Sequence, residues 1–504
     1  MIPVNRILSL ACFVAAAAWA QTADTGDRLI TGASEVKEQA GIPKSKLEFD
    51  SSDTPLVEGF NRAKRTAMGF VFDGNDPVGP WYEAAEPGRE AFCIRDTSHQ
   101  AMGAHALGLA RQNLNMLRKF AAGVSESKDW CSYWEIDRFD RPAPVDYQND
   151  ALFWYNLPAN FDLLDACYRM YVWTSDPTYV KDPAFLNFYD HTVTDYVERW
   201  GLGLDEIMTR PRLLNMRGIP GTRKFQLARG IPGYDEGNHD YVVASDVLAT
   251  QYAAYRDYAR IQEIRGNPDS ARAYLKKADD LRALIETRWW DEKNQRFYLR
   301  VGKDHNMDGH GSEALLFWDV LEDGPKLKAA SADSGSRRTE NLYKYGDPDV
   351  ALQRLIDTMT PGKSRMDYPE VPFSIIGSVV NGTMGINLQA ESALLSSVEG
   401  GWVAASVKTL SGLGSKIAWA ELRNLPVRDN EVTVRHEGTR RTTFTNQHGP
   451  AIVWWAEFPG SHDTLMVNGK AAKARMEKAP LDKTISRVRV TVGGGATVTV
   501  SVPE

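Results

Sequence analysis

The feature that most limits the fold is a change in hydrophobic periodicity near Gly400. Before it, from about residue 53 to about residue 395, apolar side chains recur mainly at the spacing of helices that bury one face. After it, the segments are short, alternating or β-branched, and turn residues separate them. The sequence therefore predicts a large helical region followed by a small antiparallel β region.

Several stretches of the first region have a helical pattern, and Gly266-Asn267-Pro268 marks a stop and restart between two of them. The expected helices are 54–69, 97–122, 151–173, 183–200, 240–265, 270–289, 313–321, 347–359 and 373–397. Roughly ten to twelve helices with few strands indicate a mainly α toroid or solenoid. No fixed-period repeat is found, which disfavours the common solenoid families.

The region after Gly400 has the pattern of strands, with turn signals such as Asp429-Asn430 and Asn468-Gly469 between them. The expected strands are 431–435, 441–446, 451–458, 464–467 and 488–502. They predict a small antiparallel β-sandwich of roughly 90 to 100 residues. The expected organisation is an N-terminal segment over 21–52, a helical domain over 53–400 and a β-sandwich domain over 401–504.

The first twenty residues are typical of a secretory signal peptide. Arg6 supplies a positive charge, residues 8–18 form an apolar run, and Ala18-Trp19-Ala20 offers small residues at the cleavage site. We expect cleavage after Ala20 and a secreted or periplasmic protein, with lipidation at Cys12 as the weaker alternative. No later stretch reaches about 18 uncharged apolar residues, so no integral membrane segment is expected after cleavage.

The net charge of -7 argues against a nucleic-acid partner, which requires a basic surface. The cysteines after the signal, Cys93, Cys131 and Cys167, allow one disulfide at most and lack the paired spacing of a metal site. The chain contains 14 Trp, 19 Tyr and 18 Phe, a composition that permits aromatic platforms for sugar rings without proving them.

The connections between the expected helices contain the candidate site residues. In the first, Arg95 and Asp96 are followed by Ser98-His99-Gln100 at the start of a helix. These donors and acceptors suit the hydroxyl groups of a sugar, since each hydroxyl both donates and accepts. The alternative is that Asp96 only caps the helix and Arg95 only pairs with it.

The second connection contains Trp134, Gln148 and Asp150. Trp134 could stack on a sugar, while Gln148 and Asp150 could bind hydroxyl groups. Alternatively, the aromatic side chains are ordinary core residues and Asp150 is a helix cap.

The third connection is Tyr234-Asp235-Glu236-Gly237-Asn238-His239-Asp240, directly before an expected helix. A carboxyl group in an apolar pocket there has a raised pKa, as a general acid requires. Capping explains Asp240 better than Glu236, so we favour Glu236 as the acid.

The fourth connection places Glu370 between Pro369 and Pro372, where it cannot be in the middle of a helix. Glu370 is the first candidate for the catalytic base, although a surface salt bridge is an alternative role. Glu313 and Glu399 are the competing bases. His305, Asp308 and His310 lie close together in sequence, but a Gly-rich loop explains them better than a metal site, and no cofactor is expected.

With these residues in view, the chain resembles the six-hairpin glycosidase superfamily, and within it distantly the glucoamylase group. The resemblance covers about residues 60–395 and rests on short motifs: Arg95-Asp96 at an early helix, Gln148-Asn149-Asp150 at a middle one, and the acidic turn around Glu236. It implies an (α/α)6 barrel, in which Arg95 and Asp96 bind the sugar being cleaved and Glu236 is the general acid.

The resulting hypothesis is a secreted hydrolase of oligo- or polysaccharides that uses Glu236 as acid and Glu370 as base, with inversion favoured over retention. Arginines in the connections, among them Arg217, Arg223 and Arg229, hint at a uronate-containing substrate, although solvated loops explain them better. One alternative is a polysaccharide lyase, with the base among His99, Tyr234 and His239. The other is a non-catalytic glycan-binding protein.

Overall fold

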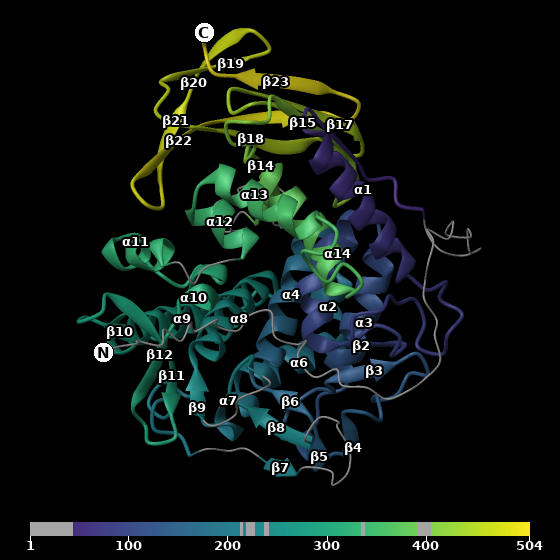
Figure 1. Cartoon of the computed structure of the whole chain (residues 1–504), viewed down its shortest axis with the longest axis vertical. Helices are drawn as coiled ribbons and strands as arrows, with labels where there is room; N and C mark the ends of the chain where they lie inside the picture. The colour runs from purple at the N-terminus through teal and green to yellow at the C-terminus, as the bar shows by residue number, and fades with distance from the viewer. Residues whose placement is uncertain (1–43, 212–214, 218–226, 236–240, 334–337, 391–404) are drawn as a thin grey trace, which may run out of the picture. The chain divides into compact units, whose positions relative to one another are not determined.

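The computed structural model describes residues 44–211, 215–217, 227–235, 241–333, 338–390 and 405–504. Helices fill most of the chain up to residue 378, and strands dominate after it (Figure 1). The helices are α1 (Thr54–Gly69), α2 (Ile94–Ala106), α3 (Ala110–Ala122), α4 (Pro158–Thr174), α5 (Thr178–Lys181), α6 (Pro183–Val193), α7 (Asp195–Arg199), α8 (Ser245–Ile264), α9 (Pro268–Arg288), α10 (Glu313–Phe317), α11 (Pro325–Ala332), α12 (Thr339–Tyr345), α13 (Pro348–Met359) and α14 (Glu370–Ser378), with the short segments η1 (Glu126–Lys128) and η2 (Val379–Thr383). None of these described helices is long and apolar enough to cross a membrane.

Four helices, α2, α4, α8 and α14, are buried over most of their surface. α2 packs between α14 and α4, and α4 packs on α8. α1, α3 and α9 flank them, with α1 against α14, α3 against α2 and α9 against α8. The close approach of α2 and α14 depends on Gly103, because a Cβ there would lie 2.0 Å from the Phe373 carbonyl oxygen.

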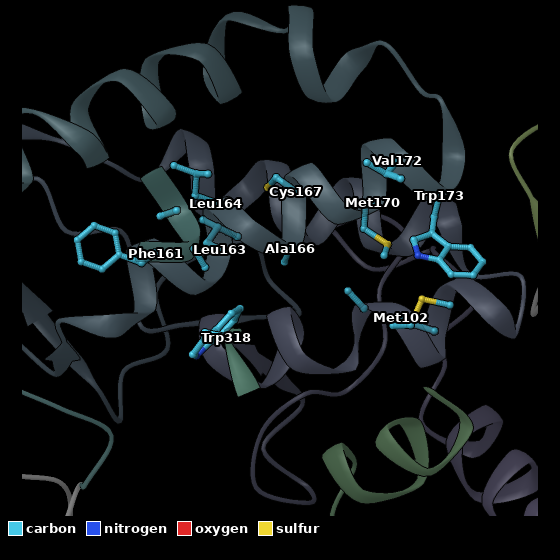
Figure 2. Packing of buried hydrophobic residues seen from close by; sticks show 14 of the residues in the cluster. Met102, Phe161, Leu163, Leu164, Ala166, Cys167, Met170, Val172, Trp173 and Trp318 are labelled. Atoms are coloured by element: carbon cyan, nitrogen blue, oxygen red, sulfur yellow. The ribbon is translucent and has the colours of Figure 1, made fainter. Parts of the chain in front are cut away.

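The helix α4 shows how completely the side chains of these helices are buried. Its apolar side chains, from Phe161 to Trp173, pack with Met102 of α2 and with Trp318 in one cluster (Figure 2). Fully burying one such side chain contributes about 1.5–3 kcal/mol. A polar side chain on α4, such as Asp162, is therefore removed from water together with its apolar neighbours.

The described strands of the C-terminal region form two large sheets. The first has the order β1 (Glu48–Ser51), β15 (Trp419–Val427), β16 (Asn430–Glu437), β17 (Arg441–His448), β23 (Thr497–Ser501), β19 (Thr464–Val467) and β20 (Lys470–Lys473). The second has the order β13 (Ile386–Ala390), β14 (Ala405–Leu410), β18 (Ile452–Pro459), β22 (Lys483–Val492) and β21 (Arg475–Ala479). The rings of Phe444 on β17 and Trp454 on β18 stack with centroids 5.1 Å apart, so the two sheets pack on each other. The predicted C-terminal β region is confirmed. It also takes in β1 and β13, which come before residue 401, while the domain boundaries themselves stay a prediction.

Small sheets link the helices. They comprise β2 (Ala91–Cys93) with β3 (Glu135–Asp137), β4 (Tyr147–Asn149) with β5 (Leu152–Phe153), β6 (Tyr155–Asn156) with β8 (Leu227–Ile231) and β7 (Asn215–Arg217), and β10 (Trp290–Asp291), β11 (Arg296–Gly302) and β12 (Met307–His310) with β9 (Tyr241–Ala244). Cys93, Cys131 and Cys167 are buried and free.

Several predicted helices differ from the observed ones. The expected helix 97–122 is two helices, since Gly108 adopts a φ of 88° that interrupts it. The expected helix 183–200 is likewise divided, at Thr194. The stretch 151–173 and the described part of 240–265 begin as strands. In the described part of 373–397, α14 ends at Ser378, the π-helical segment η2 follows directly, and strand β13 begins at Ile386. The helices α11 and α12 were not predicted.

Candidate functional site

The N-terminal turns of the buried helices contain acidic side chains that meet at one place. Asp96 lies in the first turn of α2, Asp162 near the start of α4, Asp246 in the first turn of α8, and Glu370 is the first residue of α14. The unpaired N–H groups and the dipole at a helix N-terminus favour anions. The ends of these helices are therefore suited to hold several carboxylates in a small volume.

His99 of α2 connects two of these carboxylates. Its Nδ1 lies 3.1 Å from Glu370 Oε1, within hydrogen-bond distance. Its Nε2 lies 4.0 Å from Asp162 Oδ2 on the other side of the ring. Neither Nε2 nor Asp162 Oδ2 has a hydrogen-bond partner among the described residues. The structure thus brings together His99 and Glu370, two predicted site residues 271 positions apart.

Glu370 is held in its ionised form. Burial acts to raise the pKa of Glu370, but the hydrogen bond of His99, the charge of His99 when it is protonated, and the charges of Arg95 and Arg338 outweigh it and lower the pKa. A carboxylate that stays ionised well below neutral pH is suited to accept a proton.

Asp162 and Asp246 show the opposite shift. Burial raises the pKa of Asp162 to about 6, although His99, Tyr234 and Arg95 act to lower it. Burial likewise raises the pKa of Asp246 to about 7, and the charge of Asp162 adds to the effect. The site therefore holds carboxyl groups with pKa values far apart, an arrangement that separates acid from base in catalytic sites.

Tyr234 joins the two buried aspartates. Its hydroxyl donates to Asp162 Oδ1 at 2.6 Å, and its backbone N–H donates to Asp246 Oδ2 at 2.9 Å. Asp246 Oδ1, like Asp162 Oδ2, has no hydrogen-bond partner among the described residues. Asp235 is the next residue and lies beside Tyr241. Glu236 and His239, the predicted acid and a predicted site residue, lie outside the described residues.

Arg95 covers this group from α2. Its guanidinium lies 5.6 Å from the centre of the Trp134 ring and 5.4 Å from that of Tyr234. Trp134 is 5% exposed and also contacts Trp154 and Tyr155 edge-on. Its surroundings support Arg95 and leave little ring surface for the sugar stacking that the sequence suggested.

Asp96 is a buried acceptor and not the helix cap. The cap position of α2 is Cys93, so Asp96 lies inside the first turn. Its Oδ2 accepts a hydrogen bond from the Tyr368 hydroxyl at 2.7 Å. Tyr368 comes two residues before Glu370, so this bond fixes the start of α14 against that of α2.

The helices α10 and α12 add a further pair. Glu313, the first residue of α10, forms an ion pair with Arg338 at 3.1 Å. Arg338 directly precedes α12, and its guanidinium lies 4.7 Å from the centre of the Phe317 ring. The Phe317 ring in turn lies 6.3 Å from that of His99. Glu313, a predicted competitor for the base, is therefore already neutralised by a cation.

Two predicted site residues, Gln148 and Asp150, lie in the β4–β5 region and not among the side chains around His99. Gln148 is exposed on β4. Asp150 accepts hydrogen bonds from the hydroxyls of Ser127 and Tyr147 and lies 4.0 Å from Lys128. These bonds hold Asp150 in the β4–β5 turn. Within the described part of the chain, no three His, Cys, Asp or Glu side chains are placed to hold a metal ion.

Asp162, Asp246, Arg338 and Tyr368 were not predicted from the sequence. Asp162 gave a weak signal, as a carboxylate between apolar neighbours in α4. Asp246 was hidden because the predicted helix began at residue 240, whereas α8 begins at Ser245 and puts Asp246 in its first turn. The arginine and the tyrosine gave no signal, since their roles depend on contacts distant in sequence.

Comparison with known proteins supports the fold. No family model matches the sequence, and no curated protein matches it. An α-L-rhamnosidase from Dictyoglumus thermophilum superimposes with a TM-score of 0.54 at 11% identity, over 92% of this chain and 51% of that one. A GH78 family rhamnosidase of Bacillus sp. GL1 gives 0.52 at 13% identity, over 80% and 40%, and a sialidase gives 0.53 at 10%, over 87% and 41%. This chain thus spans between 40% and 51% of these structures' lengths. The resemblance to glycosidases of the six-hairpin type is confirmed at the level of the fold.

Proposed function

We propose that the protein is a glycoside hydrolase in which Glu370 acts as the catalytic base. The observation that carries the proposal is the position of Glu370: an ionised carboxylate at a helix N-terminus, hydrogen-bonded to His99 of α2 and under the influence of the charges of Arg95 and Arg338. A base that activates water for attack on a sugar needs such a carboxylate.

The proposed scaffold is a closed (α/α)6 ring. Contacts that link α14, α2, α4, α8, α10 and α12 in succession support it, with α1, α3, α6, α9, α11 and α13 as their outer partners. In such a ring, the inner helices start at the same end, which explains why their acidic first turns meet. The glycosidase fold of the solved structures points in the same direction.

The proposed general acid is Glu236, which follows Tyr234 and Asp235 in sequence. The raised pKa values of Asp162 and Asp246 support this choice, because the environment next to Tyr234 favours protonated carboxyl groups. We further propose an inverting reaction and export through the N-terminal signal. Arg95 and Arg338 are candidate contacts for a negatively charged sugar, whereas Arg229 is paired with Asp129 at 2.7 Å.

The test is turnover of a panel of aryl glycosides by the full chain after signal removal. The solved structures suggest rhamnosides and sialosides for the panel, and the arginines suggest uronosides. Product anomers followed by NMR distinguish inversion from retention. Unsaturated product absorbing in the ultraviolet would instead indicate a lyase, and binding without turnover would indicate a glycan-binding protein.

Three variants assign the roles. Glu370→Gln should lose activity on all leaving groups, because activation of water is lost whichever group departs. Glu236→Gln should lose activity on poor leaving groups but retain it on 2,4-dinitrophenyl glycosides, which need no proton. Glu58→Gln, on the exposed side of α1, is the matched control and should behave as the wild type. Equal activity of Glu370→Gln and wild type would overturn the proposal.

A further inference from the structure

His99 lies between two carboxyl groups, and its predicted role of binding sugar hydroxyl groups does not explain this position. One ring nitrogen is bonded to Glu370, and the other faces Asp162 across a gap of 4.0 Å. Asp162 is fully buried, and the His99 side chain is 10% exposed. Two buried polar atoms left unpaired at this separation are costly, so their placement needs a reason.

We propose that Asp162, His99 and Glu370 form a triad in which Asp162 sets the charge of His99, and His99 holds Glu370 in place as an ionised base. The proposal rests on the proposed role of Glu370. Within it, His99 and Asp162 are positioning residues, which act on the reaction only through Glu370.

The triad works by moving one proton. When the gap closes, the proton of Asp162 Oδ2 passes to His99 Nε2 and leaves an aspartate and an imidazolium. The hydrogen on Nδ1 stays on the ring and donates to Glu370 Oε1 in both states. The total charge is unchanged, but a positive charge now lies against Glu370.

The other charged groups around the triad do not supply the proton that passes to His99. Arg95 on α2 and Arg338 before α12 favour the ionised form of Glu370 whether or not His99 is protonated. Proton transfer within the triad therefore changes only how strongly that form is favoured. Asp165 on α4 acts to raise the pKa of Asp162, and Asp162 in turn acts to raise that of Asp246 on α8.

Two tyrosines that face the triad remain neutral. Burial raises the pKa of the Tyr234 hydroxyl far above neutrality, and burial also raises that of Tyr368. The Phe317 ring of α10 covers His99 from a further side and carries no charge. The proton is therefore exchanged between Asp162 and His99.

The first test is the pH profile of kcat. Asp162→Asn keeps an oxygen that accepts from Tyr234 but cannot supply a proton to His99. We expect the acid limb of the profile to move up by roughly one pH unit, a tenfold loss below the limb, with kcat above it within about threefold of wild type. An unshifted limb, or an equal loss at every pH, would overturn the triad.

A matched pair of His99 variants tests the bond to Glu370. The Nδ2 of His99→Asn can take the place of Nδ1, whereas His99→Gln puts its amide near the position of Nε2. We expect kcat of His99→Gln to fall at least tenfold below that of His99→Asn, with KM within about threefold. Equal kcat values would show that the Nδ1 bond has no such role.

The second test needs no substrate, so it separates failure of the triad from failure of the proposed function. The shift in denaturant midpoint caused by Glu370→Gln is measured in the wild type and in Asp162→Asn, at pH 5 and pH 8. A triad predicts non-additive shifts, and additive shifts at both pH values would contradict it. Glu58→Gln combined with Asp162→Asn is the additive control. If no glycoside is cleaved, the proposed function fails while this cycle still decides the triad.

Discussion

A buried amide network in the C-terminal sheets and a cluster of buried polar atoms at the helix ends differ in how far their hydrogen bonds are satisfied. In the sheets, the buried side-chain amide of Asn446 is fully bonded: its Nδ2 donates to the carbonyl oxygens of Pro450 and Val492 at 2.9 and 3.2 Å. Its Oδ1 accepts from Asn430 Nδ2 at 3.0 Å. Such a network uses each polar atom for stability.

At the helix ends, His99 Nε2, Asp162 Oδ2 and Asp246 Oδ1 are buried without a hydrogen-bond partner in the described part of the chain. Each unsatisfied group costs about 1–3 kcal/mol. Stability alone does not explain three such groups in one cluster, but a site that must bind or exchange protons does. The contrast teaches that the Asn446 network serves stability, whereas the cluster at the helix ends is arranged for chemistry.

The largest expected effect compares one glutamate from each region. Glu370→Gln should lower turnover by about 10²–10⁴, because the ionised base is lost. Glu457→Gln on β18 removes a carboxylate paired with Arg487 at 3.4 Å and should leave turnover unchanged. Steady-state kinetics of both variants on the same substrate checks this. Similar losses for both would remove the contrast between the regions.

The second effect is on stability. Asn446→Ala removes its hydrogen bonds to the Pro450 and Val492 carbonyl oxygens and from the Asn430 amide. Asn430 Nδ2 and the Pro450 oxygen keep their bond to each other at 2.6 Å, so the loss should be about 2 kcal/mol of unfolding free energy. Turnover per folded molecule should not change. Denaturant unfolding followed by tryptophan fluorescence measures the cost, and a loss below about 0.5 kcal/mol would mean that the network is not a major source of stability.

The third effect concerns two histidines at contacts between helices and sheets. His105 Nε2 on α2 lies 3.0 Å from the Pro426 carbonyl oxygen, and His436 Nε2 on β16 lies 3.0 Å from that of Met384. Burial lowers the pKa of each from 6.5 to about 4. Since the unfolded state takes up the protons first, their contribution is present above pH 6.5 and is lost as the pH falls toward 4.

Between pH 7 and pH 4.5, each histidine should therefore reduce stability by about 2 kcal/mol. His105→Gln and His436→Gln should each flatten the fall in denaturant midpoint over this range. His448→Gln, at an exposed strand end, is the control and should leave the slope unchanged. A slope that is equal in all four proteins would show that these histidines do not determine acid stability.

Local signals made part of the fold predictable. The helix 54–69 was predicted with its observed bounds, since Asp53 caps it and Pro55 starts it. The break at Gly108 was missed because α2 is buried over most of its surface and α3 buries one face, so the run of buried positions continues across the turn. Strand β1 was missed because its partner β15 lies 375 residues away at the Glu48–Arg423 contact.

The site was predictable only as separate residues. His99 and Glu370 each stood out in a polar connection, but no local pattern shows that the starts of α2 and α14 meet. That meeting depends on Gly103, whose missing side chain permits the contact with Phe373. Asp162 has apolar neighbours in the sequence, as a core residue has, and only the structure shows that its carboxyl group faces the imidazole ring of His99.

The smallest expected effect is at the edge of the first sheet, where β1 joins β15. Glu48 and Arg423 form an ion pair at 3.0 Å, but both side chains are more than a third exposed, and exposed pairs contribute about 0–1 kcal/mol. Phe49, one residue on, is 4% exposed and packs on Phe60 with ring centroids 5.1 Å apart. The strand is thus held by its backbone ladder and by Phe49. Glu48→Gln should lower the free energy of unfolding by less than about 0.5 kcal/mol at low salt and by still less at high salt. A loss above about 1.5 kcal/mol would mean that this surface ion pair, and not only the backbone ladder and Phe49, stabilises the strand.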